Sequence, residues 1–410
     1  MKAEGKRAKG MTRRGFMSGA GAAGVCFTIM KPALVKAAQA NSRVGAGCIG
    51  LGGRGQMIAR MLQQHGGYQI TAVADYFAGV AETAGEQFKV AKGRRFSGLS
   101  GYRELVASKV DAVFLETPPY CFPEHVEAAV GAGCHVYIAK PLGCDVPGCL
   151  RIARMGRRAA AEKKVFLVDF QTRTDPFYIE AIRQVHQGLI GKIGMLSSEY
   201  NDESFPDPPK TGTIESRLQN LIWVNDEELG GSYLVNAGIH AIDVALWIAG
   251  GPPISAMGSS RIARNGPHGD SHDVYSVTYE FADGLILNHR GEHLKNRSEF
   301  RCECFAQGQD GYVETGYTGR VHILGNRGGY RGGDVVDLYP RGAERNIDTF
   351  HKSIVNGIYD NPTVEPSVNA TLATILGREA ARRNTKLTWD EVIRENKQLE
   401  VDLNGLQSPI

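Results

Sequence analysis

Short apolar runs alternate with segments of helical spacing in the first half of the sequence. The apolar runs at 44–49, 68–74, 111–116, 135–139 and 165–170 are typical of buried strands. Apolar residues at helical spacing follow the first run, and helices are also expected near 123–132 and 146–161. Because strands and helices alternate, the pattern predicts an α/β fold with a parallel, doubly wound sheet.

The second half has a different pattern, in which apolar and polar residues alternate. Such stretches at 195–200, 275–281, 285–290, 300–306 and 320–324 predict an antiparallel sheet. The segments 346–356 and 368–383 have the spacing of helices that could pack back on the body. The glycine-rich stretch 325–333 is typical of a turn.

Composition and charge narrow the class of protein. The chain has 410 residues, of which 42% are apolar and 22% charged, so neither a disordered chain nor a polytopic membrane protein fits. The formal net charge is +3, but the first 40 residues carry +7 and the remainder −4. A mildly acidic body has no general attraction for phosphate backbones, so no nucleic-acid partner is expected.

The basic excess at 1–40 is typical of a twin-arginine signal peptide. An uncharged stretch at 15–30 follows the arginine pair and is short for a membrane span. We expect cleavage before Asn41, the twin-arginine export machinery as a partner, and folding before export to the periplasm or beyond. An uncleaved anchor or a disordered basic tail is the alternative. The motif is Thr12-Arg13-Arg14-Gly15-Phe16-Met17, and the small residues for cleavage are Ala38-Gln39-Ala40.

A glycine-rich turn joins the first predicted strand to the first helix. The turn is Gly50-Leu51-Gly52-Gly53-Arg54-Gly55, and Asp75 ends the second strand twenty residues beyond Gly55. This is the dinucleotide fingerprint in its required context, with free N–H groups at the helix start for the pyrophosphate. A carboxylate at position 75 would accept hydrogen bonds from both ribose hydroxyls and repel a 2′-phosphate, so the cofactor predicted is NAD.

Further motifs lie at Thr117-Pro118 with His125, at 135–141, and from Gly230-Gly231-Ser232 to Asn236, His240 and Asp243. With the fingerprint, they resemble the glucose-fructose oxidoreductase, inositol dehydrogenase and rhizopine catabolism family, called Gfo/Idh/MocA. The resemblance implies a Rossmann domain at 41–172. It also implies a substrate-binding and oligomerisation α/β domain at 173–410 with a largely antiparallel open sheet, and a homodimer or homotetramer. The implied cofactor-binding residues are Gly50, Gly52, Gly53, Arg54, Gly55, Asp75, Thr117, Pro118 and Lys140.

The resemblance also implies catalytic roles. The family's Glu-Lys-Pro motif falls on 139–141, so Lys140 keeps its position beside the nicotinamide, where an ammonium stabilises charge on the reacting oxygen, but Ala139 replaces the Glu. The family's Asp-x-x-x-His falls on Asn236 and His240. We expect His240 to be the general acid–base and Asn236 to orient the substrate or the imidazole ring. Asp243 is expected to orient His240 or to pack, not to act as a base.

These expectations define an NAD-dependent oxidoreductase acting on a secondary hydroxyl of a sugar, sugar derivative or cyclitol. Since an exported enzyme has no dependable supply of soluble NAD, we expect tightly bound cofactor that is regenerated within each cycle. One chemistry that does this couples the oxidation of one substrate to the reduction of another. A second is a redox-neutral glycosidase, which oxidises, eliminates, hydrates and reduces. A non-catalytic nucleotide or sugar sensor on the same fold is the third possibility.

Other polar residues have more than one interpretation. Seven cysteines after residue 40, without regular spacing, argue against a disulfide framework, and Cys302-x-Cys304 favours one face of a strand over half a zinc site. The turn at 268–273 has metal-like residue types, but no metal is expected. Arg173 could reach cofactor or substrate. Sugar contacts or ordinary packing are both open for Tyr200, Asn201, Asp202, Glu203, Arg217, Trp223 and Tyr233.

Overall fold

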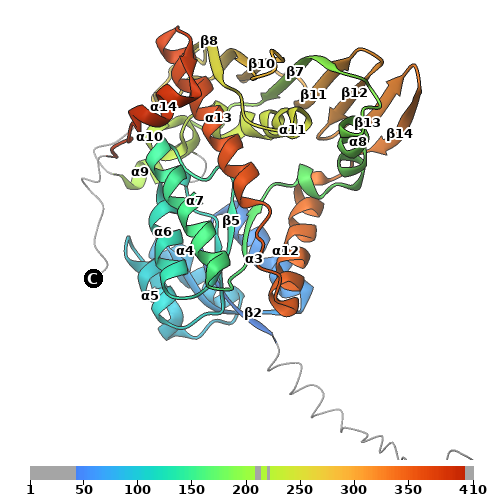
Figure 1. Ribbon diagram of the computed structural model, residues 1–410. Coiled ribbons are helices and arrows are strands. Elements are labelled where there is room, and N and C mark those ends of the chain that lie inside the picture. The colour runs from blue at the N-terminus through green and yellow to red at the C-terminus, as the bar shows by residue number, and fades with distance from the viewer. Residues whose placement is uncertain (1–42, 208–213, 219–221, 402–410) are drawn as a thin grey trace, which may run out of the picture. The chain divides into compact units, whose positions relative to one another are not determined.

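Two β-sheets organise this computed structural model, which describes residues 43–207, 214–218 and 222–401 (Figure 1). The predicted twin-arginine motif and cleavage site lie outside the described residues. The first sheet has six parallel strands in the order β3-β2-β1-β4-β5-β6. They are β1 (Val44–Ile49), β2 (Tyr68–Asp75), β3 (Arg95–Ser97), β4 (Ala112–Leu115), β5 (His135–Ala139) and β6 (Phe166–Asp169).

The helices between these strands complete a doubly wound layer, which confirms the predicted fold class. The strand order reverses between β1 and β4, and at such a switch point the carboxyl ends of the strands open a ligand crevice. The connecting helices are α3 (Gly53–His65), α4 (Ala78–Gln87), α5 (Gly101–Ala107), α6 (Phe122–Gly131) and α7 (Val146–Ala161). Short 3₁₀ turns lie at Lys92–Arg94, Pro119–Cys121 and Thr172–Thr174.

The second sheet has nine strands in the order β14-β13-β12-β11-β7-β10-β9-β8-β15. Its pairs are antiparallel except β7 with β10, so the sheet is mixed and largely antiparallel. The strands are β7 (Ile193–Asp202), β8 (Ser255–Arg261), β9 (Val274–Glu280), β10 (Ile286–His293), β11 (Arg301–Gly308), β12 (Gly311–Gly316), β13 (Arg320–Gly325), β14 (Gly328–Asp334) and β15 (Leu387–Thr388). Cys302 and Cys304 lie buried on β11 as free thiols, which confirms the strand interpretation.

The glycine-rich segment 325–333 was wrongly expected to be a turn, because most of it forms the edge strand β14. Gly332 has a φ of 55°, and a Cβ there would lie 1.6 Å from the carbonyl oxygen of Val321 on β13. Its glycine therefore permits an irregular, close strand pairing, and only residues 326–327 connect the two strands.

Helices from the second half of the chain join the two sheets. They are α8 (Pro176–His186), α9 (Glu215–Leu218), α10 (Glu227–Gly230), α11 (Ile239–Ala249), α12 (Leu338–Asn356), α13 (Val364–Arg383) and α14 (Trp389–Glu395), with a 3₁₀ turn at Ile222–Asn225 and a π-helical turn at Leu234–Gly238. Both α12 and α13 begin earlier than predicted. In Figure 1, α12 lies beside the first sheet, where the Tyr68 hydroxyl donates a hydrogen bond to the carbonyl of Ile347 (2.9 Å).

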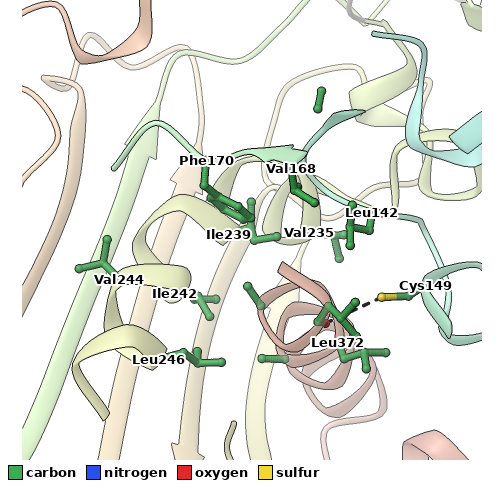
Figure 2. Close-up of a cluster of buried hydrophobic side chains, with 14 of the residues drawn as sticks. Leu142, Cys149, Val168, Phe170, Val235, Ile239, Ile242, Val244, Leu246 and Leu372 are labelled. Carbon is green, nitrogen blue, oxygen red and sulfur yellow. Dashed lines mark hydrogen bonds between the residues drawn. The ribbon is translucent and has the colours of Figure 1, made fainter. Parts of the chain in front are cut away.

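One hydrophobic core continues from the first sheet to the second. Figure 2 shows its central part, where Val168 from β6 and Phe170, which directly follows β6, meet residues of the π-helical turn, α11 and α13. The segment Glu227–Ala249 is long and apolar enough to cross a membrane by composition alone, but 89% of its most apolar window is buried inside this fold. We therefore assign this segment, which comprises α10, the π-helical turn and α11, to the core of the fold.

Candidate active site

A cavity of about 1300 Å³ lies at the carboxyl ends of the first sheet and is covered by segments of the second half. The fold brings every predicted cofactor-binding and catalytic residue to the wall of this one cavity. The roles assigned to these residues remain predictions, but their shared location does not. The lining includes Gly50, Gly52, Gly53, Arg54, Gly55, Asp75, Thr117, Pro118, Lys140, Asn236 and His240.

The glycine loop has two kinds of glycine. Gly50 has a φ of 84°, and a Cβ on Gly55 would lie 1.9 Å from the Gly50 carbonyl oxygen, so packing of strand and helix requires both. A Cβ on Gly52 or Gly53 would instead meet no atom within 4 Å. No side chain caps α3, and its first turn holds no acidic residue. A bare helix N-terminus that opens on a cavity fits the pyrophosphate of NAD.

Asp75 ties the glycine loop to the end of β2. Its carboxylate accepts hydrogen bonds from the backbone N–H of Leu51 (2.7 Å) and of Phe77 (3.0 Å), while burial raises its pKa. A carboxylate has lone pairs beyond these two, so acceptance from ribose hydroxyls is compatible with this geometry. The neighbouring Tyr76 donates its hydroxyl hydrogen to Glu215 on α9 (2.7 Å), which connects this wall to the second half of the chain.

Arg54 turns away from the loop toward the ends of β4 and β6. Its Nε lies 3.0 Å from Glu116, its Nη2 bonds Asp169, and its guanidinium lies 4.8 Å from the centre of the Tyr339 ring. Burial raises the pKa of Glu116 to about 7. Sequence reasoning missed both carboxylates. Each directly ends an apolar run, and that position at a strand's carboxyl end was the available signal.

Lys140 follows β5 and bridges to the π-helical turn. Its Nζ donates a hydrogen bond to the backbone carbonyl of Asn236 (2.7 Å). Desolvation, and next the positive charge of Arg54, lower the pKa of Lys140 to about 7. An amine that exchanges its proton near neutral pH can accept the proton of an alcohol and then, as an ammonium, stabilise negative charge on the reacting oxygen. π-helical turns are rare and frequently occur at functional sites. The location of Asn236, within such a turn and at the cavity wall, agrees with this.

His240, the second residue of α11, lies inside an aromatic enclosure. Its ring lies parallel to that of Tyr200, with centroids 6.2 Å apart, and edge-on to Tyr317 and Phe170. Desolvation, and next the charge of Lys140, hold the pKa of His240 well below its usual range. The imidazole is therefore neutral, and its Nδ1 has no hydrogen-bond partner within the described part of the chain.

Asp243 does not orient His240, so that expectation is wrong and the packing alternative holds. Its buried carboxylate forms a two-pronged ion pair with Arg173, with Nη2–Oδ1 and Nε–Oδ2 distances of 2.9 Å each. The Arg173 guanidinium also lies 5.0 Å from the ring centre of Trp247. Arg173 is therefore held in the body of the protein and is not part of the cavity wall.

The seven candidate sugar-contact residues divide into two groups. Tyr200, Asp202 and Trp223 line the cavity, whereas Asn201, Glu203, Arg217 and Tyr233 do not. The amide of Asn201 donates to Glu199, Arg217 is paired with Asp226 and Glu228, and the Tyr233 hydroxyl is bonded to backbone carbonyls. The turn at 268–273 binds protein groups, with the N–H of residues 268 and 269 donating to Asp207. Lining residues without any sequence motif were missed, namely Phe205, Pro206, Phe300, Tyr317 and Tyr339.

The fold and the glycine loop define a dinucleotide-binding protein of the Rossmann type. Residues 44–170 match the model for the oxidoreductase family with an NAD-binding Rossmann fold, and residues 178–331 match the GFO/IDH/MocA C-terminal domain. The chain therefore belongs to the Gfo/Idh/MocA family. Its cofactor is NAD, in agreement with the prediction from the fingerprint and Asp75.

Curated relatives are similar at low identity. Inositol 2-dehydrogenase 4 of Saccharopolyspora erythraea is 28% identical over 58% of this chain, and the chain spans 63% of that relative. The inositol 2-dehydrogenase/D-chiro-inositol 3-dehydrogenase of Shouchella clausii is 24% identical over 79% of this chain and 86% of its own length. The 2,7-anhydro-N-acetylneuraminate hydratase of Escherichia coli is 25% identical over 59% and 60%, respectively.

Solved structures share the fold. GenD2 from gentamicin A biosynthesis, in complex with NAD, superposes with a TM-score of 0.68 at 19% identity, over 85% of this chain and 96% of its own. The aldose-aldose oxidoreductase from Caulobacter crescentus, complexed with glycerol, gives a TM-score of 0.67 at 19% identity, over 84% and 99%. At these identities the likeness concerns the architecture.

Proposed function

We propose that this protein oxidises a secondary hydroxyl group of a sugar, sugar derivative or cyclitol with tightly bound NAD. The observation that carries the proposal is the meeting of Lys140 and His240 in the cavity that also holds the glycine loop and Asp75. The names of the relatives support the substrate class, because inositol is a cyclitol. Bound NAD supplies the hydride acceptor.

In this proposal Lys140 is the proton acceptor in place of His240, which the sequence predicted as the general acid–base, because burial holds the pKa of His240 well below its usual range. With a pKa near 7, the amine of Lys140 accepts the hydroxyl proton during oxidation and, as an ammonium, stabilises negative charge on the oxygen. The Asn236 carbonyl holds the amine in place. The neutral imidazole of His240 accepts a hydrogen bond from the same or an adjacent hydroxyl. The rings of Tyr200, Phe300 and Tyr317 line this end of the cavity and exclude water.

Export completes the proposal. The motif at residues 12–17 supports twin-arginine transport of the folded protein to the periplasm or beyond, with the cofactor already bound. A cofactor that cannot exchange with a soluble pool must be regenerated in place, and in this proposal a carbonyl compound that binds as the second substrate does so. For the whole assembly we propose a homodimer or homotetramer through the outward face of the second sheet, which exposes Met195, Met257 and Ile286. Sedimentation of the mature protein tests the assembly.

A redox-neutral glycosidase is the second candidate, and the hydratase among the relatives favours it. Transient oxidation of a sugar hydroxyl to a ketone acidifies the adjacent C–H bond, so that elimination can expel the aglycone before water adds and the hydride returns. Lys140 would stabilise the ketone oxygen, and His240 would carry the proton of the C–H bond. Net redox change is zero.

One experiment separates these functions. The mature protein is purified, its bound nucleotide is identified by mass spectrometry, and absorbance of the nicotinamide is recorded as sugars, cyclitols and aryl glycosides are added. A lasting reduced signal that a second carbonyl compound discharges supports oxidoreduction. Aglycone release without net reduction supports the glycosidase. If ligands bind but neither signal appears, the protein is a sensor and both catalytic proposals are wrong.

A further inference from the structure

The carboxyl ends of three neighbouring strands bring two acidic side chains together. Asp169 on β6 is the register partner of Ala139 on β5, and Glu116 directly follows Leu115, whose partner on β5 is Ile138. Glu116 and Asp169 thus flank Ala139 from both sides. Both line the cavity, and their side chains are 2% and 0% exposed. The small side chain of Ala139 puts no polar group between them.

Arg54 bridges the two carboxylates. It contacts Glu116 through Nε at 3.0 Å and Asp169 through Nη2, and the amide of Asn346 donates a further hydrogen bond to Asp169 (2.6 Å). One guanidinium against two carboxylates leaves one net negative charge when both carboxylates are ionised. A buried charge of this kind requires a compensating cation. Lys140, at the end of the intervening strand, is a cation when protonated and neutral when not.

The cluster lies on the nicotinamide side of the cofactor site. Asp75 at the end of β2 marks the ribose of the adenosine half, and the N-terminus of α3 marks the pyrophosphate. In a doubly wound sheet the dinucleotide crosses the switch point, so its other half extends over the ends of β4, β5 and β6. Glu116, Asp169 and Lys140 line that part of the cavity.

We propose that Glu116 and Asp169 form an anionic floor whose net charge is balanced alternately by the oxidised nicotinamide and by the ammonium of Lys140. The inference rests on the proposed function. In the oxidation, the substrate C–H bond would break, with its hydrogen and electron pair passing together as a hydride to the bound nicotinamide. The O–H bond would break with its proton passing to Nζ of Lys140, and its electron pair would form the carbonyl. The ring loses a positive charge as Lys140 gains one, so the total charge of the buried site stays constant.

The titration of the cluster agrees with this assignment. Burial raises the pKa of Glu116 and lowers that of Lys140, in each case to about 7. A cation that binds between the two groups lowers both pKa values, and therefore changes their protonation near neutral pH. Burial keeps the other titratable groups facing the cluster from β1, β5, α11 and the second sheet neutral in this range. They are Cys48, Tyr137, His240, Cys302 and Tyr317.

The test measures binding, not turnover. Mature protein freed of nucleotide is titrated calorimetrically with NAD⁺ and with NADH at several pH values, in buffers of different ionisation enthalpy. The NADH complex should hold up to one proton more than the NAD⁺ complex. The ratio of the NADH to the NAD⁺ dissociation constant should therefore rise with pH by up to about tenfold per unit across neutrality.

Variants separate charge from structure. Glu116→Gln keeps the side-chain shape and removes a negative charge, so affinity for NAD⁺ should fall roughly tenfold, the equivalent of one pKa unit of interaction, while affinity for NADH changes little. The matched control is Glu379→Gln, which removes another buried carboxylate bonded to arginines, on α13 and away from the cavity.

Three results decide the matter. A pH-independent ratio of the two dissociation constants overturns the anionic floor, as does a Glu116→Gln variant that weakens NAD⁺ and NADH equally. Should neither nucleotide bind the unaltered protein, the proposed function itself fails, and the two failures are thereby distinguishable.

Discussion

Lys140 is the residue whose proposed chemical role depends most directly on its burial, because burial lowers its pKa to about 7. Replacing it with Met retains most of the side-chain volume but removes the amine that donates a hydrogen bond to the Asn236 carbonyl at the cavity wall. We expect Lys140→Met to reduce kcat by about 10²–10³-fold, as loss of an oxyanion-stabilising group does. NAD binding, followed by quenching of protein fluorescence, should persist. Turnover at the original rate would contradict the site assignment.

The pH dependence of oxidation follows from the same amine. Oxidation needs Lys140 unprotonated, and its pKa of about 7 lies far below the ordinary lysine value. The kcat/KM for alcohol oxidation should therefore rise with pH with unit slope and level off above about 7. Because the pKa of His240 lies well below its usual range, His240 should add no inflection near neutrality. A profile that falls across pH 6–8 would contradict Lys140 as the proton acceptor.

Single residues also show where sequence reasoning reaches its limit. Lys140, Asn236 and His240 were expected in one site because each lies in a motif, and they do share the cavity wall. The strand-end positions of Glu116 and Asp169 were visible in the sequence, but only the register of β4, β5 and β6 shows that the two carboxylates flank Ala139. The role of Asp243 was also wrongly predicted, because its partner Arg173 lies 70 residues away in the sequence and their ion pair depends on a tertiary contact.

At the scale of elements, the glycine loop separates folding from binding. A methyl group on Gly55 would collide with the Gly50 carbonyl and should lower the free energy of unfolding by about 1–3 kcal/mol, as overpacking does. On Gly52 it meets open cavity, so stability should change by at most about 1 kcal/mol, the cost of an alanine N-cap.

For NAD binding, the Gly52→Ala variant should show a selective effect, whereas Gly55→Ala should affect both NAD binding and stability. Gly52→Ala puts the methyl group where the pyrophosphate approaches, so affinity for NAD should drop roughly tenfold or more, about 1.4 kcal/mol, with the melting temperature nearly unchanged. Gly55→Ala should lower both. Calorimetric melting and NAD titration on the same samples measure the two effects. Equal NAD affinity of Gly52→Ala and the original protein would remove the loop from the cofactor site.

Elements with strong local periodicity were predicted well. The strands β1 and β5 and the helix α7 coincide with their predicted ranges, because each is a buried run or an amphipathic face bounded by turn residues. The strand β14 was missed because its glycines carry no side-chain alternation. The π-helical turn at Leu234–Gly238 was missed because a continuous apolar segment does not reveal an extra residue in a turn.

At the scale of the whole molecule, the second half of the chain closes the cofactor cavity. The cavity wall combines the ends of the first sheet with Phe205, Leu218 and Trp223 from the covering segments. Helix α9 is joined to the end of β2 by the hydrogen bond from the Tyr76 hydroxyl to Glu215. We expect this connection, beside Asp75 at the end of β2, to slow release of the nucleotide, as the tightly bound cofactor proposed above would require.

Removing that hydrogen bond should speed the loss of NAD. Tyr76→Phe deletes one hydroxyl, and a net contribution of about 0.5–1.5 kcal/mol corresponds to a roughly two- to tenfold faster release. The measurement follows NAD that remains on the protein after dilution into an enzyme system that consumes free NAD. The control is Tyr68→Phe, which removes a hydroxyl bonded to the Ile347 carbonyl outside the cavity and should leave the release rate unchanged. Identical release from both variants would show that the contact of α9 with β2 plays no part in retention, and that tight binding must arise at the glycine loop and Asp75 instead.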